Sequence, residues 1–166
     1  MTSAKKAPSP SFQIRPATAT DADFILSLTP RFVAFDLPKG RTRRRVLAAI
    51  RTEVEAASRE ASANDHFFVA TDARGRRAGF LQLKLDRDFF SGARACHVAN
   101  LAVASAAEGH GVGRALLARA HRWARRHECR LMTLNVFPGN ARALALYQRA
   151  GFFPDLLRMM KPINRT

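Results

Sequence analysis

The sequence contains little cysteine, few acidic residues and no long apolar run, and each shortage excludes a class of protein. Two cysteines, Cys96 and Cys129, are too few for a disulfide framework, and neither lies in a CxxC pair typical of a metal site. No apolar stretch approaches the roughly 18 residues that a membrane-spanning helix needs. Residues 1–10 carry two lysines without an apolar core after them, unlike a signal peptide. We therefore expect a cytoplasmic protein without a metal or a membrane anchor, with residues 1–10 as a disordered leader.

The charge of the chain is strongly unbalanced. Lysine and arginine number 28 against 13 aspartates and glutamates, and 23 of the 28 are arginine, so the formal net charge is +15. Such a charge either marks a solvated, arginine-rich surface or draws an anionic ligand, whether nucleic acid or a phosphate-bearing cofactor. The chain has no helix-turn-helix, zinc-finger or RNP signature, so nucleic acid is the less favoured partner.

The hydrophobic pattern predicts a single domain over residues 11–166. Strands are predicted at residues 11–15, 66–71, 78–86, 94–103, 131–137 and 152–163, the last as one strand or two. Apolar residues every three or four positions predict helices at residues 22–28, 43–57, 111–127 and 141–150. Within residues 78–86, leucines alternate with Gln82 and Lys84, which is typical of a half-buried strand. This order predicts an α/β chain with a central mixed, mostly antiparallel sheet and helices on both faces.

A glycine-rich loop joins the strand at residues 94–103 to the next helix. The loop reads Gly109, His110, Gly111, Val112, Gly113 and Arg114. Glycines let the backbone approach a ligand closely, and the free N–H groups of the following helical turn favour an anion. The Rossmann spacing and the Walker A ending are both missing. The loop therefore predicts either a phosphate site or a plain turn between strand and helix.

A second segment, residues 135–152, reads as a strand, a capped helix and a glycine stop. Asn140 is a good N-cap and Gly151 a good residue to end the helix. Ala143, Tyr147 and Ala150 share one face at helical spacing. That face either receives a thin ligand, with the phenol hydroxyl aimed at it, or packs Tyr147 into the core.

Together the two segments resemble the GCN5-related N-acetyltransferase (GNAT) family. Residues 103–113 follow the family's V-x-x-x-x-[Q/R]-x-x-G-x-[G/A] spacing, with Glu108 at the Gln/Arg position, and residues 140–152 match N-x-x-A-x-x-L-Y-x-x-x-G-F in full. The resemblance covers nearly the whole chain after Ser11. It implies a GNAT-like acyl-CoA N-acyltransferase fold, acetyl-CoA as the co-substrate and a primary amine as the acceptor. The acceptor would be a peptide N-terminus or a small-molecule amine.

The resemblance also implies roles for individual residues. Main-chain groups at a splayed strand edge would meet the pantetheine at Leu101, Ala102 and Val103. The pyrophosphate would lie on Gly109, His110, Gly111, Val112, Gly113 and Arg114. Asn140 would contact the pantetheine arm and Ala143 would line its passage. Tyr147 would lie near the thioester sulfur and donate a proton to the leaving thiolate.

The base that this reaction needs is not evident. The attacking amine must be neutral, whereas a lysine side chain has a pKa of about 10.4 and an α-amino group one of about 8. The strand at residues 94–103 has no carboxylate. Asn100 can orient a water, and we predict that as its catalytic role. His97 could accept a proton or could be a plain buried residue; strand alternation places it on the face opposite Asn100 unless a bulge intervenes. A weak base mildly favours an acceptor of low pKa, such as an α-amino group.

The sequence also departs from the family pattern near the expected pyrophosphate and acceptor sites. A carboxylate beside a pyrophosphate is unfavourable, so we expect Glu108 to point away from it. Few acids stand near the expected acceptor rim; they are Asp36, Asp86 and Asp88. The aromatic residues 32–35 and 89–90 border the acceptor site or cap the core. Three hypotheses stay open: an N-acetyltransferase, a CoA-binding protein of the same fold without activity, and a basic nucleic-acid-binding module. The oligomeric state, including a homodimer, is also open.

Overall fold

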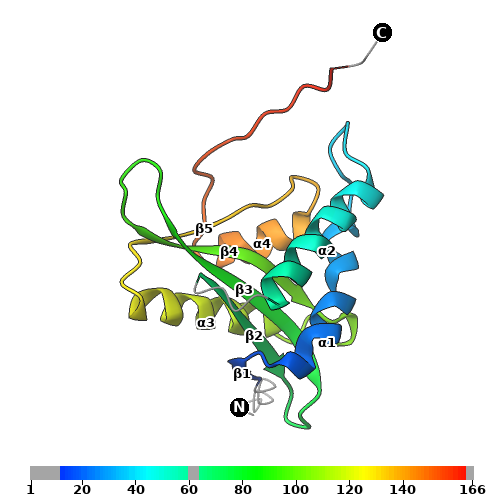
Figure 1. Cartoon of the computed structure of the whole chain (residues 1–166), viewed down its shortest axis with the longest axis vertical. Helices are drawn as coiled ribbons and strands as arrows, with labels where there is room; N and C mark the ends of the chain where they lie inside the picture. The colour runs from blue at the N-terminus through cyan, green and yellow to red at the C-terminus, as the bar shows by residue number, and fades with distance from the viewer. Residues whose placement is uncertain (1–11, 60–63, 164–166) are drawn as a thin grey trace, which may run out of the picture.

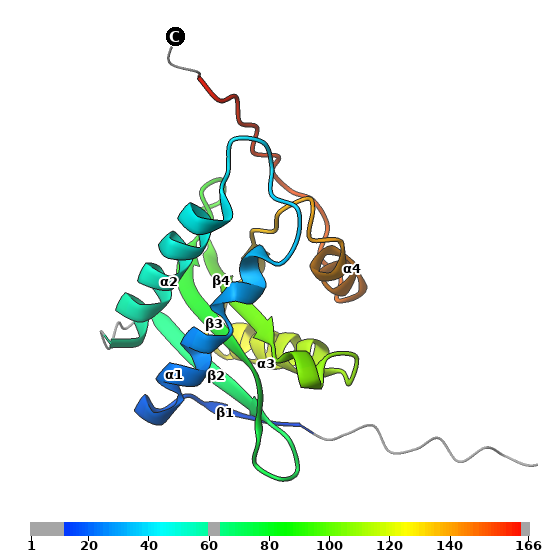
Figure 2. The same cartoon turned by 90° about the vertical axis from the view of Figure 1, so that its right-hand side faces the viewer.

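The computed structural model describes residues 12–59 and 64–163 as one β-sheet with helices on both faces (Figures 1 and 2). The strands are β1 (Gln13–Pro16), β2 (Asp65–Thr71), β3 (Arg77–Arg87), β4 (Arg94–Val103) and β5 (Leu131–Leu134). The α-helices are α1 (Ala22–Ser27), α2 (Arg43–Arg59), α3 (Val112–Arg126) and α4 (Ala141–Arg149). Short 3-10 turns are η1 (Ala19–Asp21), η2 (Thr29–Val33) and η3 (Ser105–Ala107). The predicted leader lies outside the described residues.

The sheet is mixed and mostly antiparallel, as predicted. Its strand order is β1-β2-β3-β4-β5. The first four strands pair antiparallel with their neighbours, and β5 pairs parallel with β4. The parallel pair follows from its connection, because α3 crosses between the two strands and returns the chain to the same end of the sheet.

Two apolar cores lie on opposite faces of the sheet. On one face α3 buries Leu116 and Trp123 against Leu83 and Val98. On the other face α1 and α2 cover the sheet, and Val54 of α2 belongs to this core. The prediction of a half-buried strand at residues 78–86 was wrong for its first half, because both faces of β3 are covered from Ala78 to Leu83.

A β-bulge interrupts the pairing of β3 with β4. Gln82 pairs with Asn100 and Leu83 pairs with Val98, so Ala99 has no partner of its own. Side chains alternate between the two faces along an ordinary strand, and one extra residue reverses that alternation. As a result, Asn100 and His97, which are three positions apart, lie on the same face of the sheet as their β3 partners Gln82 and Lys84.

The chain beyond α4 differs from the sequence prediction. Residues 152–163 form no helix or strand and run away from the sheet as an extended segment (Figure 1). The strand predicted at residues 131–137 also ends early, at Leu134. Phe153, Leu157 and Met159 are each about four-fifths exposed. The apolar pattern of this segment suits a strand, but a strand also needs a neighbour for its backbone, and the described part of the chain supplies none.

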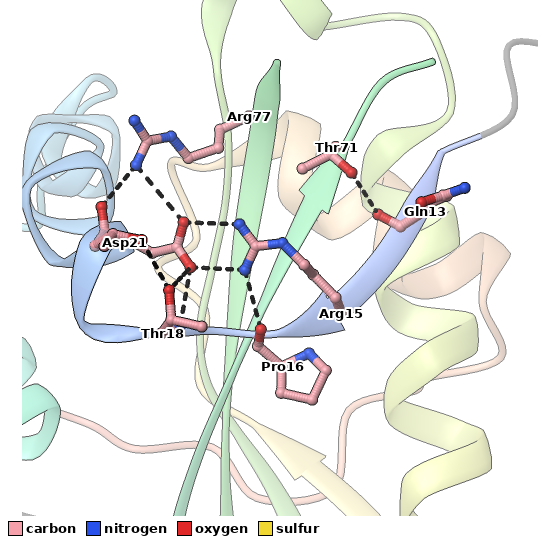
Figure 3. A network of polar contacts seen from close by, with 8 residues as sticks. Gln13, Arg15, Pro16, Thr18, Asp21, Thr71 and Arg77 are labelled. Carbon is pink, nitrogen blue, oxygen red and sulfur yellow. Dashed lines mark hydrogen bonds and ion pairs between the residues drawn. The ribbon is translucent and has the colours of Figure 1, made fainter. Parts of the chain in front are cut away.

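A buried carboxylate ties the start of the chain to the sheet (Figure 3). Asp21 is 1% exposed and accepts two hydrogen bonds from the Arg15 guanidinium, at 2.7 and 2.9 Å. It also accepts a hydrogen bond from the Thr18 backbone N–H at 2.9 Å, and Arg77 of β3 lies 3.6 Å away. The Arg15 hydrogen bonds are the main cause that lowers the pKa of Asp21 to about 2.

Asp21 should therefore make stability depend on pH in the acid range. A carboxyl whose pKa is lowered on folding stabilises the fold above its unfolded pKa, and this stabilisation is lost as the pH falls towards the folded pKa. Here that window runs from the ordinary value of 3.8 down to about 2. We expect Asp21→Asn to lower the free energy of unfolding at pH 7 by roughly 2 kcal/mol, at 1.36 kcal/mol per pKa unit.

Denaturant unfolding at pH 2.5, 4 and 7 measures this effect. The Asp21→Asn protein should lose less stability between pH 4 and 2.5 than the wild type does. Asp23→Asn is the matched control, because Asp23 is exposed in the first turn of α1, two residues after Asp21. Equal acid sensitivity of wild type and Asp21→Asn would contradict the assignment.

Candidate active site

The edge of β4 that faces β5 is paired over only part of its length. The parallel ladder joins Ala95 to Leu131 and ends where Val98 meets Leu134. Beyond that point, β4 continues to Val103 while the chain after β5 turns away as irregular structure. Among the described residues, no strand pairs with this edge of β4 from Ala99 to Val103. Leu101, Ala102 and Val103, predicted to meet a ligand through their main-chain groups, thus lie on an edge of β4 that no described strand pairs with.

The glycine-rich loop follows directly from that edge. Gly109 and Gly111 have φ angles of +78° and +88°, in the left-handed region that favours glycine. An ideal Cβ on Gly109 would meet no atom within 4 Å. Glycine therefore suits this position because of its backbone conformation and not because space is short. Gly111 is the N-cap of α3 and supplies no side chain to the first turn. The N–H groups of that turn, at Val112, Gly113 and Arg114, point out of the helix as donors for an anion.

Charged residues surround the loop on two sides. The guanidinium of Arg114 lies beside Gly111, because an ideal Cβ there would be 3.9 Å from an Nη atom. Glu108 makes ion pairs with Arg31 of η2 and Arg142 of α4. Arg31 also donates to the Ser105 hydroxyl at 3.0 Å. The Glu108 carboxylate therefore joins three elements, which is a structural use for the acid at the position where the family pattern has Gln or Arg.

Helix α4 begins and ends as predicted. The Asn140 side-chain oxygen accepts a hydrogen bond from the Ala143 N–H at 3.2 Å, which leaves the Asn140 amide NH₂ as a donor. At the other end Gly151 has φ +91°, and the Phe152 N–H bonds back to the Tyr147 carbonyl at 3.0 Å. With the Gly151 N–H donating to the Gln148 carbonyl, this is a Schellman motif.

Contacts with α3 and with Phe152 set the position of Tyr147. Gly113 of α3 lies so close to α4 that a Cβ there would be 2.9 Å from a Leu146 methyl group. The glycine loop and the tyrosine helix are therefore adjacent. The Tyr147 ring packs edge-on against Phe152 at a centroid distance of 5.9 Å. Burial raises the pKa of Tyr147, so its hydroxyl stays protonated and able to donate.

A directed chain of hydrogen bonds leads to Asn100. Gln82 is fully buried and donates its amide NH₂ to the Asp65 carboxylate at 2.7 Å. The Gln82 oxygen then accepts from the Asn100 amide NH₂, also at 2.7 Å. Because a carboxylate only accepts, the direction of both amides follows from Asp65. The Asn100 oxygen is thus turned away from Gln82 and is left to accept a hydrogen bond from elsewhere.

The bulge at Ala99 places His97 on the same face of the sheet as Asn100. His97 pairs with Lys84 and Asn100 pairs with Gln82, and these two β3 residues share a face. Simple strand alternation would place His97 and Asn100 on opposite faces. The bulge at Ala99 reverses that alternation between them. The His97 Nδ1 lies 2.8 Å from the Thr133 hydroxyl of β5.

A cavity opens between α2 and the loop that follows β5. Its volume is about 430 Å³ and its lining includes Arg41, Arg45, Val46, Ile50 and Phe137. No acidic residue lines it. The cavity thus combines an apolar wall with two cations.

The aromatic residues expected near the acceptor divide into separate environments. Phe35 packs against Phe137 beside this cavity, with ring centroids 5.9 Å apart. Phe32 instead packs edge-on against the buried Phe80, as a core residue. Phe89 and Phe90 are exposed in the turn that joins β3 to β4, at the opposite end of β4 from Val103.

Sequence analysis missed three residues of this site: Asp65, Gln82 and Thr133. Gln82 and Lys84 alternate with leucines, and that pattern alone indicates solvent exposure. The helices α1 and α2 bury that face of the sheet instead, and no local pattern at Gln82 records it. Thr133 stands on a different strand, 36 positions after His97, so only the parallel pairing brings the two together.

The described residues contain neither a metal-binding cluster nor a membrane-spanning helix. In residues 12–59 and 64–163, no three His, Cys, Asp or Glu side chains gather as a metal site would require. Over the same residues, no helix combines the length and apolarity that crossing a bilayer demands.

Comparison with known proteins identifies the architecture. The family model described as "Acetyltransferase (GNAT) family" matches residues 35–152. A putative acetyl transferase from Pyrococcus furiosus is 22% identical, with a TM-score of 0.74 over 92% of this chain and 100% of that one. The aminoglycoside N-acetyltransferase AAC(6')-Iy in complex with CoA is 20% identical, with a TM-score of 0.64 over 96% and 99%. A Trypanosoma brucei acetyltransferase is 19% identical, with a TM-score of 0.62 over 92% and 100%.

The raised pKa of Tyr147 can be measured directly, because it is the single tyrosine of the chain. Phenolate absorbance followed between pH 8 and 12 should show a midpoint above the ordinary value of about 10. Unfolding in urea exposes the ring and should return the midpoint to that ordinary value. A folded protein that titrates at or below it would contradict the raised pKa of Tyr147.

Proposed function

The chain belongs to the GNAT acetyltransferase family, and from that premise we propose that it transfers the acetyl group of acetyl-CoA to a primary amine. The observation that carries this proposal is the continuity of three features: the unpaired β4 edge, the glycine loop and the uncapped first turn of α3. A ligand with a long polar arm and a pyrophosphate fits these three adjoining features, with the arm along the β4 edge and the pyrophosphate on the loop and the first turn of α3. A plain turn between strand and helix would not need the open edge beside it.

In this proposal each part of acetyl-CoA meets a different element. The pyrophosphate lies on residues 109–114, where N–H donors and Arg114 favour an anion. The pantetheine arm runs along Leu101–Val103, past Ala143 and the free amide NH₂ of Asn140. The thioester then lies between β4 and Tyr147.

The reaction is direct attack of the amine nitrogen on the thioester carbonyl carbon. The carbon–sulfur bond breaks, and Tyr147 donates a proton to the departing thiolate. Asn100 accepts a hydrogen bond from the amine or from a water beside it, because its oxygen is turned away from Gln82. The overall change converts an ammonium ion and a thioester into an amide, a thiol and one proton released to solvent.

The arginine-lined cavity favours an acceptor with acidic character. Arg41 and Arg45 line it beside Val46, Ile50 and Phe137, and no acid does. Polyamines and aminoglycosides carry several positive charges, which these arginines repel. The acceptor that fits best is the α-amino group of a peptide with acidic or apolar first residues. One structural neighbour is AAC(6')-Iy with a CoA-linked acetylneamine analogue, and this chain should not share that acceptor.

An acceptor screen tests the proposed function. Thiol release from acetyl-CoA would be followed with three amines: a peptide with acidic first residues, a neutral peptide and a polyamine. We expect the highest kcat/KM for the acidic peptide and the lowest for the polyamine. Binding of acetyl-CoA without thiol release on any amine would instead favour a CoA-binding protein that has lost catalysis.

Tyr147→Phe tests the proton donor. The variant keeps the ring that packs against Phe152 but lacks the hydroxyl. We expect kcat to fall at least 10-fold, within the range of general acid–base effects, while acetyl-CoA affinity stays within about 2-fold. An unchanged kcat would remove Tyr147 from the mechanism.

A matched pair of glycine variants tests the phosphate loop. Gly111 and Gly92 both have positive φ, +88° and +66°, and Gly92 lies in the distant turn between β3 and β4. Alanine at either position should cost roughly 1 kcal/mol of stability, because a left-handed conformation is unfavourable for it. Calorimetric titration with acetyl-CoA should show weaker binding for Gly111→Ala only. Equal affinity in the two variants would place the pyrophosphate elsewhere.

A further inference from the structure

The reaction proposed above needs a proton acceptor, and β4 carries no carboxylate. We infer that His97 is the general base, acting through Nε2 while Thr133 holds Nδ1. This inference rests on the proposed function and adds to it the residue that takes the proton from the amine.

The geometry of β4 and β5 supports the assignment. The bulge at Ala99 turns His97 to the face that Asn100 occupies. His97 pairs with Thr133 near the end of the parallel ladder, whose last pair is Val98 with Leu134. The ring therefore lies just before the two strands part, next to the opening that would receive the thioester.

The contact with Thr133 occupies Nδ1 and leaves Nε2 as the nitrogen that can act. The two atoms, Nδ1 and Oγ1, lie 2.8 Å apart. With the proton on Nδ1 and donated to Thr133, Nε2 keeps its lone pair and can accept a proton. Among the described residues this is the single hydrogen bond of the ring, so Nε2 has no competing partner there.

The charged groups around His97 come from three elements. Lys84 and Asp86 stand on β3, and Glu53 of α2 bonds Lys84 at 2.6 Å. Asp65 of β2 lies 3.9 Å from the same ammonium. Burial is the main cause that lowers the pKa of His97; Lys84 lowers it further, while Asp86 and Glu53 raise it. The ring is therefore neutral at physiological pH, as a base must be before it acts.

The proton balance is complete with His97 in this role. The acceptor ammonium loses one proton to Nε2, directly or through a water held by Asn100, and its nitrogen then attacks the carbonyl carbon. The second nitrogen proton leaves as the amide forms and, through water, replaces the proton that Tyr147 gives to the thiolate. His97 releases its proton to solvent, so the net product is one free proton.

The variant His97→Asn tests the inference, because an asparagine amide can keep the contact with Thr133. Activity would be measured from pH 6 to 9.5 with a peptide α-amino acceptor, whose own pKa is about 8. We expect kcat to fall about 100-fold at pH 7 and the loss to shrink towards pH 9.5, where the acceptor is itself neutral. A structural role would give the same loss at every pH.

Two further variants complete the comparison. His121→Asn, on the exposed face of α3, should leave the pH profile unchanged. Thr133→Val should lower kcat in the same pH-dependent way, about 10-fold at pH 7, and Thr133→Ser should restore it. A loss in His97→Asn that does not vary with pH, or no loss at all, would overturn the inference.

A measurement on the wild-type protein covers the case in which His97→Asn does not fold. Nitrogen-15 NMR of the imidazoles distinguishes the two tautomers. His97 should be neutral at pH 7 with its proton on Nδ1; a proton on Nε2, or a doubly protonated ring, would overturn the inference. If the wild-type protein acetylates no amine in the screen, the proposed function fails first and this inference fails with it.

Discussion

The main-chain hydrogen bonds of β4 run along almost its whole length towards β3 but over only four residue pairs towards β5. This asymmetry decides where a ligand can lie. The parallel ladder holds β5 near the start of β4, and the chain after Leu134 leaves the sheet. The unpaired edge that remains leads straight into the glycine loop and the first turn of α3. Every part of the candidate site is placed relative to that opening.

The bulge at Ala99 has a second consequence, because it selects which side chains share a face. Without it His97 would face α3 and its apolar core. With it His97 and Asn100 share the face that α1 and α2 cover, where the Asp65–Gln82–Asn100 chain also runs. Buried polar groups are costly unless they are paired, and here each amide is paired in one direction. That direction is what leaves the Asn100 oxygen free to accept.

Positive charge gathers at both ends of the site. The α3 end favours anions through N–H groups and Arg114, while Glu108 is occupied by Arg31 and Arg142. The cavity near α2 is also cationic, through Arg41 and Arg45. The net charge of +15 is thus partly concentrated where a phosphate and an acidic acceptor would enter. Other arginines on α2 and α3 are solvated, among them Arg44, Arg51, Arg122, Arg125 and Arg126. Arg119 differs, because its guanidinium lies over the Phe68 ring.

Much of the fold followed from local patterns. Helical periodicity placed α2, α3 and α4; the cap residues Asn140 and Gly151 placed both ends of α4, because N-caps and Schellman motifs are local structures. The two motifs placed the loop and the tyrosine helix in the right order. The strand predicted at residues 152–163 failed because strand propensity does not create a neighbouring strand. Gln82 was misjudged because alternation with leucine does not reveal which helices cover the polar face.

The sequence by itself determined most of the elements, the glycine loop and the helix that presents Tyr147. Local spacing and cap chemistry are sufficient for those features, because each depends on residues a few positions apart. Only the tertiary structure decided that His97 meets Thr133, that Asp65 orients Asn100 through Gln82, and that Glu108 is paired. These contacts join residues 17 to 77 positions apart. Those of His97 and Asn100 also depend on strand register. One bulged residue changes that register, and the sequence of β4 does not mark Ala99 as different from any other small residue in a strand.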